Sequence, residues 1–139
     1  QVLQFQRLIP KIECCTKKSK IMTKIAIIVF SDTGTAEALG KVSNVFTLAN
    51  EAIENGDDLR FIFEGAGTKW IGELEDENHK LHSLYKGLKE HVTGACAFCA
   101  QAYGVKSKVE QAGIKLLSEY KDHPSLRTLF AEGYQVLSV

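Results

Sequence analysis

The sequence predicts a single α/β domain, folded as a three-layer α/β/α sandwich around a mainly parallel, five-stranded sheet. After residue 22, short apolar segments alternate with longer segments whose apolar residues recur at helical spacing. The first apolar segment, residues 24–30, is continuous and rich in β-branched residues, as in strands that helices cover on both faces. Strict alternation of strands and helices implies parallel pairing through right-handed crossovers, which gives a sheet of the flavodoxin or Rossmann type.

Each expected element has its own signal in the sequence. The expected strands are residues 24–30, 59–63, 91–95, 114–117 and 134–139. The expected helices are residues 36–55, 81–88, 96–103, 107–112 and 124–132. Ser107 and Glu110 have the spacing of a capping box, and Pro124 falls in a first helical turn, where proline is tolerated. Phe130 is expected to face inward, and residues 65–70 are expected to form a loop.

Composition narrows the class of protein. The 139 residues are 45% hydrophobic and 24% charged, as in one globular domain with a real core. The formal net charge is zero, so neither nucleic acid nor a membrane surface is an expected partner. The four cysteines form two close pairs in a chain large enough to fold without disulfides. A cytoplasmic location is therefore expected.

The first 21 residues differ from the rest. They hold several basic residues against the single acid Glu13 and show no sustained period. Met22 directly precedes the first expected strand. We therefore expect residues 1–21 to be a basic extension that is disordered or non-native, and residues 22–139 to form the domain.

Cys96 lies where the third expected strand passes into a helix. A thiol at this position faces unpaired backbone N–H groups and the positive end of the helix dipole, which favour the thiolate. Cys99 follows one turn later on the same face. Cys96 and Cys99 are therefore candidate catalytic residues, for sulfur transfer or for thiol–disulfide exchange. The alternative is that both are small buried side chains of the core.

Polar residues and glycines follow the first two strands at the same edge of the sheet. In open α/β sheets, ligands bind beyond the carboxyl ends of the strands. We therefore expect a cleft there, next to Cys96. The candidate substrate-binding residues are Asp32, Thr33, Gly65, Gly67, Thr68 and Trp70.

Neither a metal nor a cofactor is expected. A zinc site at the Cys96-x-x-Cys99 pair would need two more ligands, and His91 and His123 belong to no second paired motif. Residues 31–35 are similar to the phosphate loop of flavodoxins, and Trp70 offers a ring for a flavin. Such a cofactor would not explain Cys96, so a nucleotide- or flavin-binding module is kept only as an alternative.

Four segments, residues 24–30, 63–70, 95–104 and 133–139, together carry a family resemblance. In their order and spacing the chain resembles the DsrE/DsrF-like family of small sulfur-relay proteins. The resemblance implies a DsrE/F-like three-layer fold, a homo-oligomer (trimer or hexamer), and sulfur donor and acceptor proteins as partners. It also implies a persulfide on Cys96, which lies eight residues before Gly104. Cys99 is not part of the relay pattern.

Overall fold

The structure is a computed structural model that describes residues 21–139, so residues 1–20 of the expected extension lie outside it. Its centre is a five-stranded, all-parallel sheet in the order β4-β3-β2-β1-β5. The strands are β1 (Lys24–Val29), β2 (Asp58–Phe63), β3 (Gly94–Cys96), β4 (Leu116–Leu117) and β5 (Gln135–Ser138). The α/β class and the parallel sheet predicted from the sequence are therefore confirmed.

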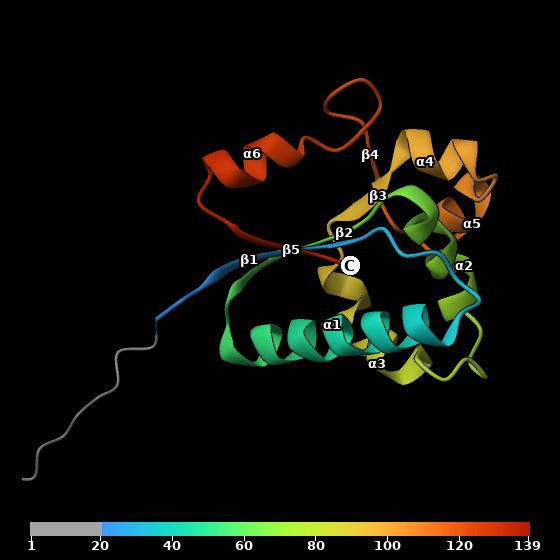
Figure 1. Cartoon of the computed structure of the whole chain (residues 1–139), viewed down its shortest axis with the longest axis horizontal. Coiled ribbons are helices and arrows are strands. Elements are labelled where there is room, and N and C mark those ends of the chain that lie inside the picture. Colours follow the sequence, from blue (N-terminus) through green and yellow to red (C-terminus); the bar gives the residue numbers. More distant parts are fainter. Residues whose placement is uncertain (1–20) are drawn as a thin grey trace, which may run out of the picture.

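Helices cover both faces of this sheet (Figure 1). The α-helices are α1 (Ala36–Asn55), α2 (Trp70–Leu74), α3 (His82–Leu88), α4 (Ala97–Ala102), α5 (Lys106–Gln111) and α6 (Leu126–Ala131). Two short 3₁₀ helices are η1 (Gly65–Lys69) and η2 (Lys89–His91). None of the helices within residues 21–139 is both long and apolar enough to cross a membrane.

The two faces of the sheet carry cores of different size. Alternate residues of β1 point to opposite faces, so that Ile27 and Val29 pack with α1, α2 and α3 in the larger core. Ala26 and Ile28 belong to a smaller core, in which Leu129 of α6 covers the sheet. Figure 1 shows α6 on one side of β1 and β5, and α1 with α3 on the other.

Several predicted details are corrected by the structure. The expected loop after β2 is η1 followed by α2, because Trp70, Ile71 and Leu74 are buried at helical spacing. Helix α5 begins at Lys106 with no side-chain cap, so the capping box at Ser107 and Glu110 is wrong.

The last helix also differs from its prediction. Ser125 is the N-cap of α6, so Pro124 lies before the helix and not in its first turn. Phe130 is 65% exposed and faces solvent, because the short α6 turns only Leu129 fully onto the sheet.

Candidate functional site

The site centres on the junction between β3 and α4. Cys96 is the last residue of β3 and the N-cap of α4, where its Sγ accepts the backbone N–H of Cys99 at 3.4 Å. Gly94 lets β3 lie tightly against β4, since a Cβ there would come within 2.5 Å of the Lys115 carbonyl oxygen. Helix α4 is followed by Gly104 at φ 69°, the expected left-handed residue. Cys96 is wholly buried and Cys99 is 9% exposed.

A tight turn brings His123 to Cys96. Tyr120 and His123 exchange two backbone hydrogen bonds of 2.9 Å, and the two residues between them have positive φ, as in a type I′ turn. The carbonyl of Asp122 in this turn accepts the N–H of Phe98, one of the otherwise unpaired donors at the start of α4. The turn is thereby fixed to α4, and His123 Nδ1 lies 3.2 Å from Cys96 Sγ.

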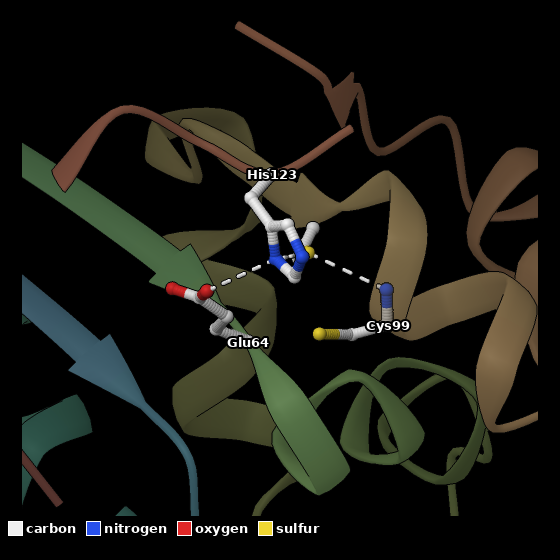
Figure 2. A group of neighbouring side chains, drawn as sticks. Glu64, Cys99 and His123 are labelled. Carbon is white, nitrogen blue, oxygen red and sulfur yellow. Dashed lines mark hydrogen bonds and ion pairs between the residues drawn. The ribbon is translucent and has the colours of Figure 1, made fainter. Parts of the chain in front are cut away.

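Glu64 approaches the same point from the end of β2. Strand β2 pairs with β3 through Ile62↔Gly94 and Phe63↔Ala95, and continuing this register by one residue places Glu64 beside Cys96. The Glu64 Oε1 atom lies 3.6 Å from His123 Nδ1. Figure 2 shows Glu64, Cys99 and His123 directed toward one another from three separate segments.

Burial dominates the electrostatics of this site. It raises the pKa of the Cys96 thiol to about 12, although the hydrogen bond from the Cys99 N–H acts in the opposite direction. Burial likewise raises the pKa of the Glu64 carboxyl, against the nearby charge of His123. The predicted preference for a Cys96 thiolate is therefore wrong. Helix α4 has only six residues, and its dipole and free N–H groups do not compensate for the loss of water.

The predicted substrate-binding residues form a group around η1, which packs against α4 and β3. Asp32 accepts the Thr33 N–H at 2.7 Å and forms an ion pair of 2.7 Å with Lys69. Within residues 21–139, no hydrogen bond or ion pair joins any of the six predicted residues to Cys96 or Cys99.

The other members of this group hold the backbone together. The buried Thr68 hydroxyl donates to the Gly65 carbonyl at 2.8 Å, and the buried Trp70 indole donates to the Ser31 carbonyl at 2.8 Å. A Cβ at Gly67 would lie 2.0 Å from the Val29 carbonyl oxygen, so only glycine fits there. Trp70 also borders an open cavity of about 590 Å³ at the start of α1. Substrate binding by this group stays a prediction.

Sequence reasoning missed Glu64 and set His123 aside. Neither residue belongs to a spaced motif with the cysteines, because they lie 32 and 27 positions from Cys96. One signal for Glu64 was present, since it is the first residue after an apolar strand, at the sheet edge where Cys96 was expected. The premise that the cysteine pair lacks two further metal-ligating side chains does not hold in the folded chain.

Comparisons with known proteins bear on the fold. No protein-family model matches the chain. The uncharacterized protein MJ0733 of Methanocaldococcus jannaschii is 28% identical over 117 residues, which cover 84% of this chain and 95% of that protein. The crystal structure of the ychN protein from E. coli superposes with a TM-score of 0.54 at 17% identity, covering 85% of this chain and all of that one.

The chain has a DsrE-like fold. This follows from the likeness to the ychN protein together with the all-parallel sheet. A conserved protein of unknown function, BT1422 of Bacteroides thetaiotaomicron, has a TM-score of 0.48 at 14% identity and covers 82% of this chain and 94% of its own. Fold alone does not assign an activity, so the chemistry has to be argued from the site.

Proposed function

We propose that this protein is a sulfur carrier of the DsrE-like type, in which Cys96 accepts sulfur as a persulfide and passes it to another protein. The observation that carries the proposal is the thiol–imidazole pair, with Cys96 Sγ 3.2 Å from His123 Nδ1 at the carboxyl end of β3. The resemblance to DsrE/DsrF-like proteins supports it. Sulfur donor and acceptor proteins, a trimeric or hexameric assembly and a cytoplasmic location belong to the same proposal.

The His123 imidazole can act as the base that the buried Cys96 thiol needs. A thiol with a pKa of about 12 is almost entirely neutral at neutral pH, whereas the thiolate is the nucleophile. His123 Nδ1 is placed to accept the Cys96 proton as the sulfur attacks, which is how a base activates a neighbouring nucleophile. The His123 side chain is 36% exposed and lies beside the buried Cys96 sulfur, so the imidazole connects Sγ with the protein surface.

The transfer itself balances without an added oxidant or reductant. The Cys96 thiolate attacks the outer sulfur of a donor persulfide, forming an S–S bond to Sγ while the S–S bond of the donor breaks. The donor leaves as a thiolate and takes the proton held by His123. Cys96 then carries a persulfide, which an acceptor thiolate attacks in the same way.

Thiol–disulfide exchange is the second candidate. Its support is that the Sγ atoms of Cys96 and Cys99 belong to a cluster whose ligand atoms all lie within 4.8 Å of one another. Cys99 would then resolve a mixed disulfide formed at Cys96, and the protein would lose two hydrogens on oxidation.

Mass spectrometry separates the two candidates. The reduced full chain is incubated with glutathione persulfide, and peptide mapping locates any added sulfur. The mapping also distinguishes sulfur added to Cys14 or Cys15 from sulfur added to the site. We expect a gain of one sulfur on Cys96 that Cys96→Ser abolishes and the matched control Cys99→Ser retains. Sulfur found only on other cysteines would overturn the carrier proposal. A loss of two hydrogens that either substitution abolishes would establish the redox alternative.

A further inference from the structure

We propose that Glu64, Cys96, Cys99 and His123 form a binding site for a thiophilic divalent cation, with Zn²⁺ as the best fit. One ligand atom from each side chain lies within 4.8 Å of the other three. The inference rests on this cluster alone and does not depend on the sulfur-carrier function.

The set of donors matches zinc chemistry. Two cysteine sulfurs, one imidazole nitrogen and one carboxylate oxygen are ligand types that Zn²⁺ accepts in four-coordinate sites. With zinc–ligand bonds of about 2.0–2.3 Å, tetrahedral geometry separates the ligand atoms by about 3.3–3.8 Å. His123 Nδ1 lies 3.2 Å from Cys96 Sγ and 3.6 Å from Glu64 Oε1, close to that spacing.

One nitrogen of the imidazole faces two neighbours, and the Cys96 thiol has a second acceptor in the Asp122 carbonyl oxygen at 3.8 Å. His123 Nδ1 carries either one hydrogen or one lone pair, yet it faces both the Cys96 sulfur and the Glu64 carboxylate. If Nδ1–H donates to Glu64, the nitrogen cannot accept the thiol hydrogen. If Nδ1 accepts that hydrogen, its lone pair is occupied and it offers Glu64 no donor. A cation at the centre of the cluster would let Cys96, His123 and Glu64 act as electron-pair donors at the same time.

Glu64 gives an independent reason. The residue is only 8% exposed, and its Oε2 atom is buried with no hydrogen-bond partner among residues 21–139. Leaving a buried carboxylate oxygen unpaired is costly, and such groups are rare in folded proteins. In the part of the chain that the structure describes, this is the one buried side-chain oxygen or nitrogen without a partner. A cation bound through Oε1 would neutralise the carboxylate charge and so lower the cost of burying the unpaired oxygen.

The surrounding backbone suits a closed site. The ligands come from the end of β2, from the start of α4, and from the turn that the Phe98 N–H holds to α4. The Cys99 N–H donates to Cys96 Sγ, and hydrogen bonds of this kind orient metal ligands. With Cys96 wholly buried and four protein ligands present, coordination would be complete without water. Cys96 cannot be a zinc ligand and carry a persulfide at the same time, so zinc and sulfur would exclude each other.

Cobalt spectroscopy and native mass spectrometry test the site. The full chain is reduced, stripped with a chelator and titrated with Co²⁺ and with Zn²⁺, in parallel with a Cys14→Ser/Cys15→Ser variant that removes the other two cysteines. We expect one ion per chain, a sulfur-to-cobalt charge-transfer band in the near ultraviolet, and the intense visible bands of tetrahedral cobalt. Zn²⁺ should displace Co²⁺ and abolish both the charge-transfer band and the visible bands.

Ligand variants make the result specific. Glu64→Gln and His123→Ala should each weaken binding by about 10-fold or more. Glu37→Gln, which removes an exposed carboxylate on α1, should leave the affinity unchanged. The far-ultraviolet circular dichroism of each variant reports whether it has folded. Binding without the sulfur band, or equal affinity in folded Glu64→Gln and His123→Ala, would overturn the proposal. Persulfide formation is measured on the stripped protein, so failure of one proposal does not decide the other.

Discussion

Two groups of polar side chains lie at the carboxyl edge of this sheet, and they are satisfied to different degrees. In the group around η1, the buried Thr68 hydroxyl and Trp70 indole each donate to a nearby backbone carbonyl. In the cysteine group, one nitrogen of His123 faces two partners, and one oxygen of Glu64 has no partner in the described chain. In the first group, the Thr68 and Trp70 donors have their partners within the chain, and the group stabilises the fold. The second group would gain its missing partner from a bound ligand.

The largest expected effect on stability comes from removing the Trp70 side chain from the group around η1. Trp70→Ala should lower the free energy of unfolding by about 3–5 kcal/mol, because the indole is 1% exposed and a cavity would replace it. Denaturant unfolding of the chelated protein measures the change. The matched control is Phe130→Ala, whose ring is 65% exposed and which should change stability by about 0.5 kcal/mol or less. A similarly small loss for Trp70→Ala would show that the group around η1 contributes little to the free energy of unfolding.

A smaller effect of opposite sign is expected at Glu64. In metal-free protein at neutral pH, Glu64→Gln should raise the free energy of unfolding by on the order of 1 kcal/mol, because it removes a charge buried without adequate compensation. Zinc at 100 times its Kd should stabilise the unsubstituted protein by about 2.7 kcal/mol. The variant should lose about half of this gain or more at the same zinc concentration, if its affinity falls by about 10-fold or more. Destabilisation of the metal-free variant would mean that the carboxylate is already well paired.

The smallest effect is expected at Glu75, a carboxylate that does have its partners. Burial acts to raise the pKa of Glu75, but hydrogen bonds from Lys89 at 2.8 Å and Tyr85 at 2.7 Å outweigh it and lower the pKa. A lowered carboxyl pKa contributes stability that is present above its ordinary value and is lost as the pH falls through the lowered value. Glu75→Gln should therefore cost less than about 1 kcal/mol at neutral pH, since solvent screens the Glu75–Lys89 pair, whose side chains are 36% and 31% exposed.

Thermal unfolding at two pH values checks the sign of the pH dependence that Glu75 gives to stability. The difference between the parent and Glu75→Gln should shrink as the pH falls below the usual carboxyl range. A difference that is constant with pH would mean that the ionised form of Glu75 receives no net stabilisation from Lys89 and Tyr85.

The fold could be predicted because its signals are local. The bounds of α1 follow from Thr35, which caps the helix through its side chain, and from Gly56 at φ 72°, which ends it. The β1 strand is recognisable because residues 26–29 are buried on both faces and the strand is apolar from Ile25 to Val29. Phe130 was assigned wrongly because periodicity alone does not say how much of a short terminal helix the sheet can cover.

The site could be predicted only in part, because its properties come from distant segments. The position of Cys96 at the end of β3 follows from its own neighbours in sequence. The raised pKa of the Cys96 thiol could not be predicted in this way, because its burial depends on β2, β4 and the turn that holds His123. Glu64 and His123 join the cysteines only through strand register and that turn, and no spacing motif records either contact.

In both proposals, the cysteine cluster serves an external ligand through the Cys96 sulfur. Site-resolved mass spectrometry tests it most directly, on protein treated with glutathione persulfide after chelation and, in parallel, after loading with one equivalent of Zn²⁺. We expect one added sulfur on Cys96 in the chelated protein and strong protection of Cys96 in the zinc-loaded protein. An unmodified Cys96 in the chelated protein would contradict the carrier function, and equal modification with and without zinc would contradict the shared site.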